Sequence, residues 1–193
     1  MGNTKEAYKQ FVLDGPVSIC DEWGRLVQRM EYRGGVPHGE TVVYERGVVR
    51  LRQQYVNGRP SGVCLVYSEG GVLLSEMRYR DGLREGEARI YTRAGLLLRR
   101  ERYEEDQLEG EVLEYDERGQ VRERTPYAQG RLNGVAIVYH PNGQPMRKTH
   151  YRAGRQLGPP AEYGEDGQVK RALPALSRWA RLVQLVKRWW RGA

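Results

Sequence analysis

The sequence repeats itself every 24 residues, and this period limits the possible folds more than any other feature of the chain. Each period holds two tyrosines, one followed by a glycine after four residues and the other by a glycine after seven. The first tyrosine–glycine pairs are Tyr67 and Gly71, Tyr91 and Gly95, Tyr115 and Gly119, and Tyr139 and Gly143. The second pairs are Tyr79 and Gly86, Tyr103 and Gly110, Tyr127 and Gly134, and Tyr151 and Gly158. Such a period is typical of stacked repeat arrays, so we interpret these residues as structural.

The repeats extend beyond these units with small irregularities. Cys20 occupies the first tyrosine position of the earliest unit, and Tyr163 opens an incomplete last unit. The unit that contains Tyr44 is one residue shorter, and Asp106 stands where a glycine is expected three residues after Tyr103. We therefore predict an N-terminal cap segment over residues 1–17, six repeats and a partial seventh over 18–170, and a separate segment over 171–193.

Each unit contains two short runs of alternating apolar and polar residues, which is the pattern of β-strands. Val63, Leu65 and Tyr67, for example, would share one face of a sheet. The runs are separated by loops that end in glycine, such as 92–95, and by glycine-containing connections such as 80–86. The predicted fold is all-β: an elongated, single-layer antiparallel array of β-hairpins. Because only 39% of the residues are hydrophobic, we expect a thin sheet with one modest apolar stripe and stacked tyrosines.

The period stops at Arg171, and the remaining residues follow the pattern of a basic amphipathic α-helix. Its candidate contacts with a membrane or a partner are Arg178, Trp179, Arg181, Lys187, Arg188, Trp189, Trp190 and Arg191. Two roles are open for this helix, and they can coexist. It could cover the last hairpin and close the open sheet edge. It could instead bind a partner or an anionic membrane surface through its tryptophans and cations.

The location of the net charge of +7 is more informative than its size. Residues 171–193 contain six Lys and Arg residues and no acidic residue, so residues 1–170 carry only +1. The array therefore lacks the one-sided basic stripe that nucleic-acid binding requires, and a nucleic-acid partner is disfavoured. The basic tail favours an acidic partner, or a lipid-directed enzyme that is met at a membrane surface.

No motif in the chain indicates catalysis or a cofactor. The histidines, His38, His140 and His150, lack cysteines or carboxylates at metal-ligand spacing. A phosphate-binding loop, a nucleophile elbow and an HExxH motif are missing as well. Cys20 and Cys64 would point to opposite faces two units apart, which predicts free thiols. We expect a protein that is not an enzyme and that binds no cofactor or metal.

The first residues contain no apolar core of a secretory signal, and the chain has no apolar stretch of membrane-spanning length. We expect a cytoplasmic protein, in contact with the inner membrane if the tail binds there. If a signal peptide had been removed, the expected location would be the periplasm.

The spaced pattern Tyr-x-x-x-Gly followed by Tyr-x-x-Gly-x-x-x-Gly resembles the MORN-type repeats. It is most similar to the variant in bacterial YwqK-family antitoxin or immunity proteins, and residues 55–62, 79–86 and 127–134 carry it best. The resemblance implies a hairpin array that binds proteins and sometimes membranes and has no catalytic residues. It further implies a toxin as the partner, such as a nuclease, deaminase or phospholipase, neutralised by steric occlusion. The alternative is a scaffold or membrane-tethering protein anchored by the C-terminal helix.

Overall fold

The structure, a computed structural model, describes residues 12–170, and residues 1–11 and 171–193 lie outside the described part. The described residues form seventeen strands in one sheet. The first eight are β1 (Gly15–Cys20), β2 (Leu26–Arg33), β3 (Val36–Glu45), β4 (Val48–Val56), β5 (Arg59–Tyr67), β6 (Leu73–Arg80), β7 (Leu83–Tyr91) and β8 (Leu97–Glu104). The others are β9 (Gln107–Leu108), β10 (Gly110–Tyr115), β11 (Val121–Ala128), β12 (Arg131–Leu132), β13 (Gly134–Tyr139), β14 (Pro145–Arg152), β15 (Arg155–Gln156), β16 (Ala161–Tyr163) and β17 (Val169–Lys170).

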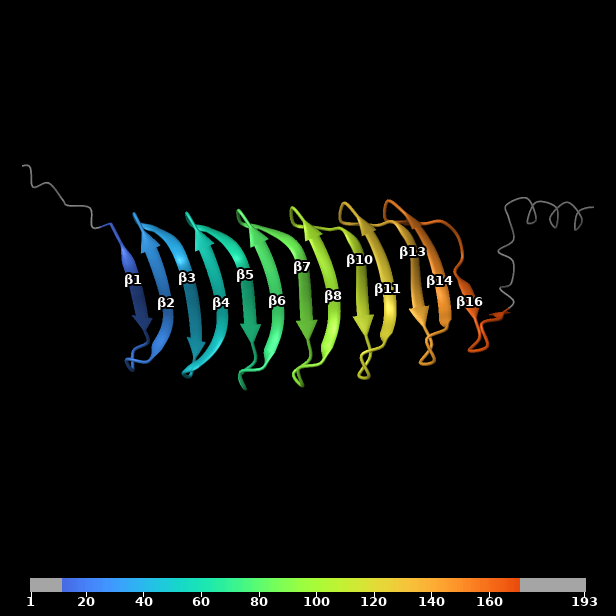
Figure 1. The fold of residues 1–193 in the computed structure, drawn as a ribbon, viewed down its shortest axis with the longest axis horizontal. Coiled ribbons are helices and arrows are strands. Elements are labelled where there is room, and N and C mark those ends of the chain that lie inside the picture. Colours follow the sequence, from blue (N-terminus) through green and yellow to red (C-terminus); the bar gives the residue numbers. More distant parts are fainter. Residues whose placement is uncertain (1–11, 171–193) are drawn as a thin grey trace, which may run out of the picture.

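Leaving aside the short strands β9, β12 and β15, consecutive strands pair antiparallel, so the chain advances as a row of hairpins in a single layer (Figure 1). The short strands β9, β12 and β15 pair with the same neighbours as β10, β13 and β16, which continue them after a break. This arrangement confirms the predicted all-β, elongated hairpin array. The C-terminal helix that was predicted over residues 171–193 lies outside the described residues.

Four-residue loops connect the hairpins along one edge of the sheet. The first loop residue is usually Asp, Ser or Thr, and its side-chain oxygen accepts hydrogen bonds from later backbone amides. Asp116 Oδ1, for example, accepts from the amides of Arg118 and Gln120 at 2.9 Å each. The last loop residue, such as Gly119 with φ of 77°, occupies the left-handed region that favours glycine. The periodic glycine of the first pair therefore closes these loops.

Two-residue turns connect the strands along the other edge. In Asn57-Gly58 and Asp81-Gly82 both residues have positive φ, as a type I′ hairpin turn requires. The turn in segment 80–86 is thus shorter than the sequence suggests, because Gly86 lies inside β7. Successive turns are joined by backbone hydrogen bonds: the amide of Gly82 donates to Pro60 O, and the amide of Gly154 donates to Leu132 O. These bonds fix each repeat onto the preceding one.

A periodic glycine, which lies inside β5 and β7 and begins β10 and β13, faces a tyrosine of the next strand. Gly62 is paired with Tyr79, Gly86 with Tyr103, Gly110 with Tyr127 and Gly134 with Tyr151. The glycines lie at positive φ beside register shifts such as that between Met77 and Tyr79. A side chain at this position would be strained by the positive φ. The glycine of each second pair is matched to the second tyrosine of the following repeat, so the contact joins neighbouring repeats.

The core is thin, because residues 12–170 form one sheet and place no second layer on it. Val42, Ala88 and Val112 are the most buried apolar residues, and Thr41, Gln53 and Glu101 are buried beside them in the middle of the strands. Among residues 12–170, no large side chain is fully enclosed. Stability therefore comes mainly from contacts between neighbouring strands.

Candidate protein-binding surface

The two faces of the sheet carry different side chains, and the cross-strand register defines them. We call front face the one that carries Arg52, Arg89 and Arg124 in its middle row, and back face the one that carries Gln53, Ala88 and Thr125. The two tyrosine rows are divided between them. Tyr139 lies on the front face with Arg124, whereas Tyr127 and Tyr151 lie on the back face with Thr125.

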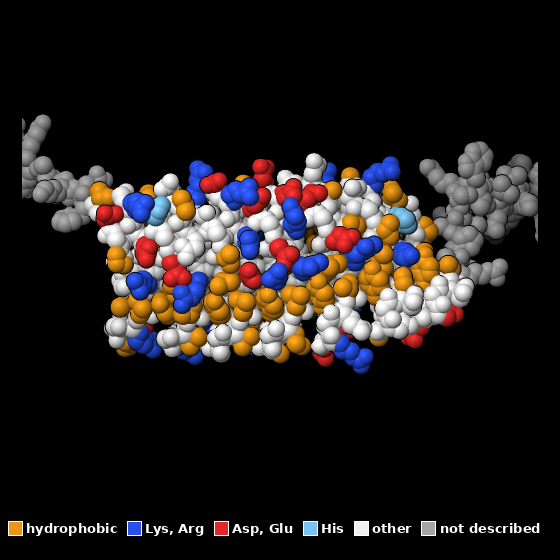
Figure 2. All heavy atoms as spheres, viewed as in Figure 1, with side chains coloured by type: hydrophobic (Ala, Val, Ile, Leu, Met, Phe, Trp, Pro, Cys, Tyr) orange, Lys and Arg blue, Asp and Glu red, His pale blue; other side chains and the backbone are white. Residues whose placement is uncertain are grey.

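The front face, seen in Figure 2, is striped along the length of the array. Basic and acidic side chains alternate over its middle, and an apolar band runs below them near the four-residue loops (Figure 2). Three arginines of the middle row form ion pairs with carboxylates of the next row: Arg52 with Glu40, Arg89 with Glu87, and Arg124 with Glu111. These pairs are largely exposed, so each contributes little to stability. The opposite charges within each of these pairs nonetheless neutralise one another.

The front face has an apolar hollow of about 550 Å³, lined by Leu113, Val121, Tyr139, Pro141 and neighbouring polar residues. Further along the band, the Lys148 ammonium lies 5.0 Å from the centre of the Tyr163 ring. Aromatic rings with cations at their rim are frequent at protein interfaces. The front face therefore offers an apolar strip with a charged border.

Asp106, the residue that replaces a glycine, is held by Arg84 of the preceding repeat. Its Oδ1 accepts hydrogen bonds from Arg84 Nε at 2.8 Å and from the Arg84 amide at 2.9 Å. These bonds hold the pKa of the Asp106 carboxyl below its usual value. The same guanidinium lies 4.1 Å from the centre of the Tyr103 ring. The turn lacks its usual glycine at this position, and a contact between repeats stabilises it instead.

Tyr103 also belongs to a buried polar group on the back face. Its hydroxyl donates to Glu101 Oε1 at 2.8 Å, and Arg99 Nε donates to the other carboxylate oxygen at 2.8 Å. Burial, together with this hydrogen bond, raises the pKa of Tyr103. Glu101 is 5% exposed, so its charge depends on these two donors.

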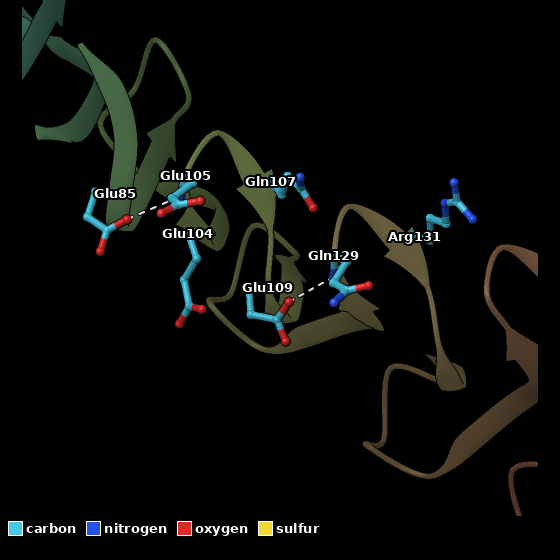
Figure 3. Close-up of a pocket in the computed structure, with 7 residues that line it drawn as sticks. All are labelled: Glu85, Glu104, Glu105, Gln107, Glu109, Gln129 and Arg131. Carbon is cyan, nitrogen blue, oxygen red and sulfur yellow. Dashed lines mark hydrogen bonds between the residues drawn. The ribbon is translucent and has the colours of Figure 1, made fainter. Parts of the chain in front are cut away.

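A cavity of about 680 Å³ lies along the edge of two-residue turns (Figure 3). The cavity is lined by Gln107, Gln129, Arg131 and four glutamates: Glu85, Glu104, Glu105 and Glu109. Two of these carboxylates stabilise the turn of the following repeat. Glu85 accepts from the amide of Glu105 at 3.2 Å, and Glu109 accepts from the amide of Gln129 at 2.8 Å, as the dashed lines in Figure 3 show. A polar residue directly before the strand glycine recurs with the period of the repeat, and the predictions made from the sequence did not include it.

A smaller pocket, of about 210 Å³, lies on the back face over strands β8 to β14. Its polar lining consists of Arg99, Glu114, Glu123, Thr125, Tyr127 and Tyr151, and its apolar lining consists of Val112, Leu132 and Ala136. Charge-bearing and aromatic groups therefore meet in a hollow of side-chain size. The 24-residue period predicts the positions of the two tyrosines in this pocket, but it does not predict the two glutamates.

The described residues contain no group of His, Cys, Asp and Glu arranged to hold a metal ion. Within the same part of the chain, no helix of membrane-spanning length and hydrophobicity is present. Cys20 and Cys64 are free thiols, and burial raises the pKa of Cys64. Cys64 is therefore less reactive than an exposed cysteine.

The predicted residues divide into two groups. The periodic tyrosines and glycines lie at strand ends, in loops and at the strand positions described above. The predicted contact residues between Arg178 and Arg191 lie outside the described residues.

Two consecutive segments, residues 108–129 and 132–153, match a family model described as a MORN repeat variant. Each segment covers about one period of the array, from a short strand to the next two-residue turn. Among curated proteins, none matches the chain. Repeats of this type are generally non-catalytic modules that bind proteins or membranes. The two matched segments lie next to each other in the hairpin array and are similar to MORN repeats.

Proposed function

We propose that this protein is a non-enzymatic binding module that acts as an immunity or antitoxin-like protein. Its sheet would lie against a toxin or effector enzyme and cover the active site or the entrance for substrate. The YwqK-like sequence pattern motivates the choice of a toxin as the partner. The observation that carries the proposal is the single layer formed by residues 12–170, in which no other described segment covers either face of the sheet.

The composition of the surface supports binding to a protein. The front face combines a continuous apolar band with a border of paired charges, and the back face combines tyrosines with carboxylates. Interfaces between proteins use this combination of aromatic contact area and a polar rim. A preformed, rigid sheet also loses little conformational entropy on binding, which favours affinity.

Affinity purification of the full chain from its native cells, followed by mass spectrometry, tests the proposal. The expected result is one partner at equal stoichiometry whose hydrolase, nuclease or deaminase activity falls when the purified chain is added. A partner whose activity is unchanged at saturation would contradict occlusion. Recovery of lipid and membrane proteins without such a partner would contradict the immunity function.

A second candidate function is a scaffold or membrane tether, and the composition of residues 171–193 favours it. This segment holds six cations, no acid and three of the four tryptophans of the chain. Each cation near an anionic surface contributes about 1 kcal/mol of attraction.

Replacing Arg178, Arg181, Lys187 and Arg188 by Gln in the full chain separates the roles of this segment. A tether predicts that the variant loses binding to phosphatidylglycerol vesicles while the melting temperature stays unchanged. Phosphatidylcholine vesicles are the control, because they lack the net negative charge. A cap on the array instead predicts that removing residues 171–193 lowers the melting temperature. Vesicle binding by the variant equal to that of the wild type would exclude an electrostatic tether.

A further inference from the structure

Strands β10 and β11 place two carboxylates directly opposite each other on the back face. Glu114 is the cross-strand partner of Glu123, and both line the pocket of about 210 Å³. Like charges in this position repel each other and destabilise the pair of strands. Because this pair of carboxylates destabilises the sheet, a cation supplied by a partner would relieve the repulsion between them.

The position of Glu114 is aliphatic in the other complete repeats. The residues that correspond to it are Ile19, Val43, Val66, Ile90 and Val138. In the partial last unit the corresponding residue is Glu162, which is exposed and paired across the strands with Arg147. Only the unit around Glu114 sets a carboxylate against a second carboxylate. The hairpin array as such therefore does not require this pair.

Charges within the array neutralise only one of the two carboxylates. Arg122 lies 2.8 Å and Arg99 3.6 Å from Glu114, so that carboxylate has two basic partners. Glu123 accepts a hydrogen bond from the Thr125 hydroxyl at 3.2 Å, and no Lys or Arg among residues 12–170 forms an ion pair with it. Glu123 is also half-buried, which makes an unneutralised charge more costly than at an open surface.

The walls of the pocket suit a cationic side chain. Tyr127 and Tyr151 line it beside Leu132 and Ala136. Ring faces attract Lys and Arg head groups, and apolar walls can contact their aliphatic stems. The volume is smaller than that of ordinary pockets for cofactors or metabolites, which hold several hundred Å³. It corresponds instead to one inserted side chain.

The surroundings of the pocket are strongly acidic. Residues 101–125 contain ten Asp and Glu residues and four Arg residues, whereas Lys and Arg outnumber the acids over the rest of the described chain. Some carboxylates of this stretch lie at the edge of two-residue turns and others on the back face, whereas Glu111 lies on the front face and Glu117 in a four-residue loop. This local field attracts a basic partner and differs from the acidic partner that the basic tail suggested.

We propose that the pocket between Glu114, Glu123, Tyr127 and Tyr151 is the anchor point for an Arg or Lys side chain of the partner protein. The cation forms an ion pair with Glu123, shares Glu114 with Arg99 and Arg122, and lies against the tyrosine rings. The partner therefore presents a basic segment to the back face of the array. This inference rests on the proposed protein-binding function and adds the chemistry of the partner to it.

Titration of the full chain with a short synthetic peptide of alternating Arg and Ser tests the anchor. The probe peptide is compared with a peptide in which Gln replaces every Arg. We expect binding of the Arg peptide only, with shifts of the Tyr127 and Tyr151 ring resonances in NMR spectra. The double substitution E114Q and E123Q should weaken binding at least about tenfold. It should also leave the fold intact: the like-charge contact disappears, and of the two arginines that lose Glu114, Arg99 keeps its ion pair with Glu101 and Arg122 is largely exposed to solvent.

The matched control is E111Q with E117Q, which removes two charges from β10 and its loop but none from the pocket. Glu111 lies on the front face and pairs with Arg124, and Glu117 is an exposed loop residue. We expect the control to bind the peptide within about twofold of the wild type. Equal weakening by both double variants would overturn the anchor, since it would reveal only a general effect of charge. Unchanged binding by E114Q with E123Q would overturn it as well.

Capture of the native partner distinguishes this inference from the proposed function. If the wild type captures a partner and E114Q with E123Q captures it equally well, the binding function holds and the anchor is wrong. If the Arg peptide binds at the pocket but no protein partner is captured, the anchor holds and the immunity function is wrong.

Discussion

At the scale of single residues, side chains that break the repeat are stabilised by specific polar contacts. Asp106 takes the left-handed conformation of a turn glycine, with φ of 67°, and its carboxylate binds Arg84. Glu101 lies in a row whose other members are mostly neutral, and it is held by Tyr103 and Arg99. These two exceptions to the repeat are therefore bound to their neighbours on the same sheet.

The ion pair of Asp106 predicts a pH dependence of stability. Because Arg84 lowers the folded-state pKa of Asp106, its contribution is present above the unfolded value, near pH 4. The contribution is lost as the pH falls through the lowered folded-state pKa. The melting temperature of the wild type should therefore exceed that of D106N at neutral pH, and the two should converge as the pH falls to 2. A constant difference over this range would show that the carboxylate charge has no role.

Loss of the Tyr103 hydroxyl should destabilise the array. In Y103F the buried Glu101 carboxylate loses one of its two donors, at a cost of about 1–3 kcal/mol. Tyr115 provides the control, because its hydroxyl has no hydrogen-bond partner in the part of the chain that the structure describes. Y115F should change stability by less than about 0.5 kcal/mol. Urea unfolding followed by circular dichroism measures both, and equal midpoints for the two variants would contradict the account.

At the scale of strands and turns, each repeat is fixed by backbone features rather than by a core. The two-residue turns donate to carbonyls of the preceding repeat, and the strand glycines face tyrosines of the next strand. These contacts use positive φ values and register shifts, both of which need particular residues. Glycine and tyrosine recur periodically in the sequence because each repeat uses them for these contacts.

Substitution of strand glycines by alanine should separate backbone strain from crowding. Gly110 has φ of 84° and no atom near the added methyl, whereas Gly134 has φ of 121° and Pro126 Cγ only 3.0 Å away. G110A should cost about 1–2 kcal/mol from the left-handed backbone alone. G134A should cost about 1–3 kcal/mol more because of overpacking against Pro126. Urea midpoints test this order, and a less stable G110A would contradict it.

At the scale of the whole molecule, the array is a one-dimensional stack whose interior strands have two neighbours and whose terminal strands have one. Stability in such a stack is a sum of terms within and between adjacent repeats. The charge distribution is also linear, with carboxylates concentrated between β8 and β11. Position along the array therefore determines both local stability and the local electrostatic field.

Hydrogen exchange should reveal this gradient of stability. Amides of β5 to β8 should exchange more slowly than those of β16 and β17, by roughly tenfold or more, because the last strands are short and lie at the sheet edge. Exchange of the intact chain, read by mass spectrometry after proteolysis, provides the measurement. Uniform protection from end to end would show that the array unfolds as a single cooperative unit.

The sequence by itself determined the all-β hairpin array, because its period marks contacts that are local or that join adjacent strands. Loop glycines such as Gly119 and the spacing of Tyr103 and Gly110 required no long-range information. Only the tertiary structure showed that the turn in 80–86 is confined to Asp81 and Gly82, and that the two tyrosine rows lie on opposite faces.

The pocket around Glu123 also depended on the tertiary structure. Glu114 and Glu123 meet because of the strand register, and each register shift at a bulge changes which residues oppose one another and which face they occupy. These shifts arise from backbone geometry at several glycines acting together. The residue pattern of any one strand does not encode them, so the fold could be predicted from the sequence while the arrangement of charges on each face could not.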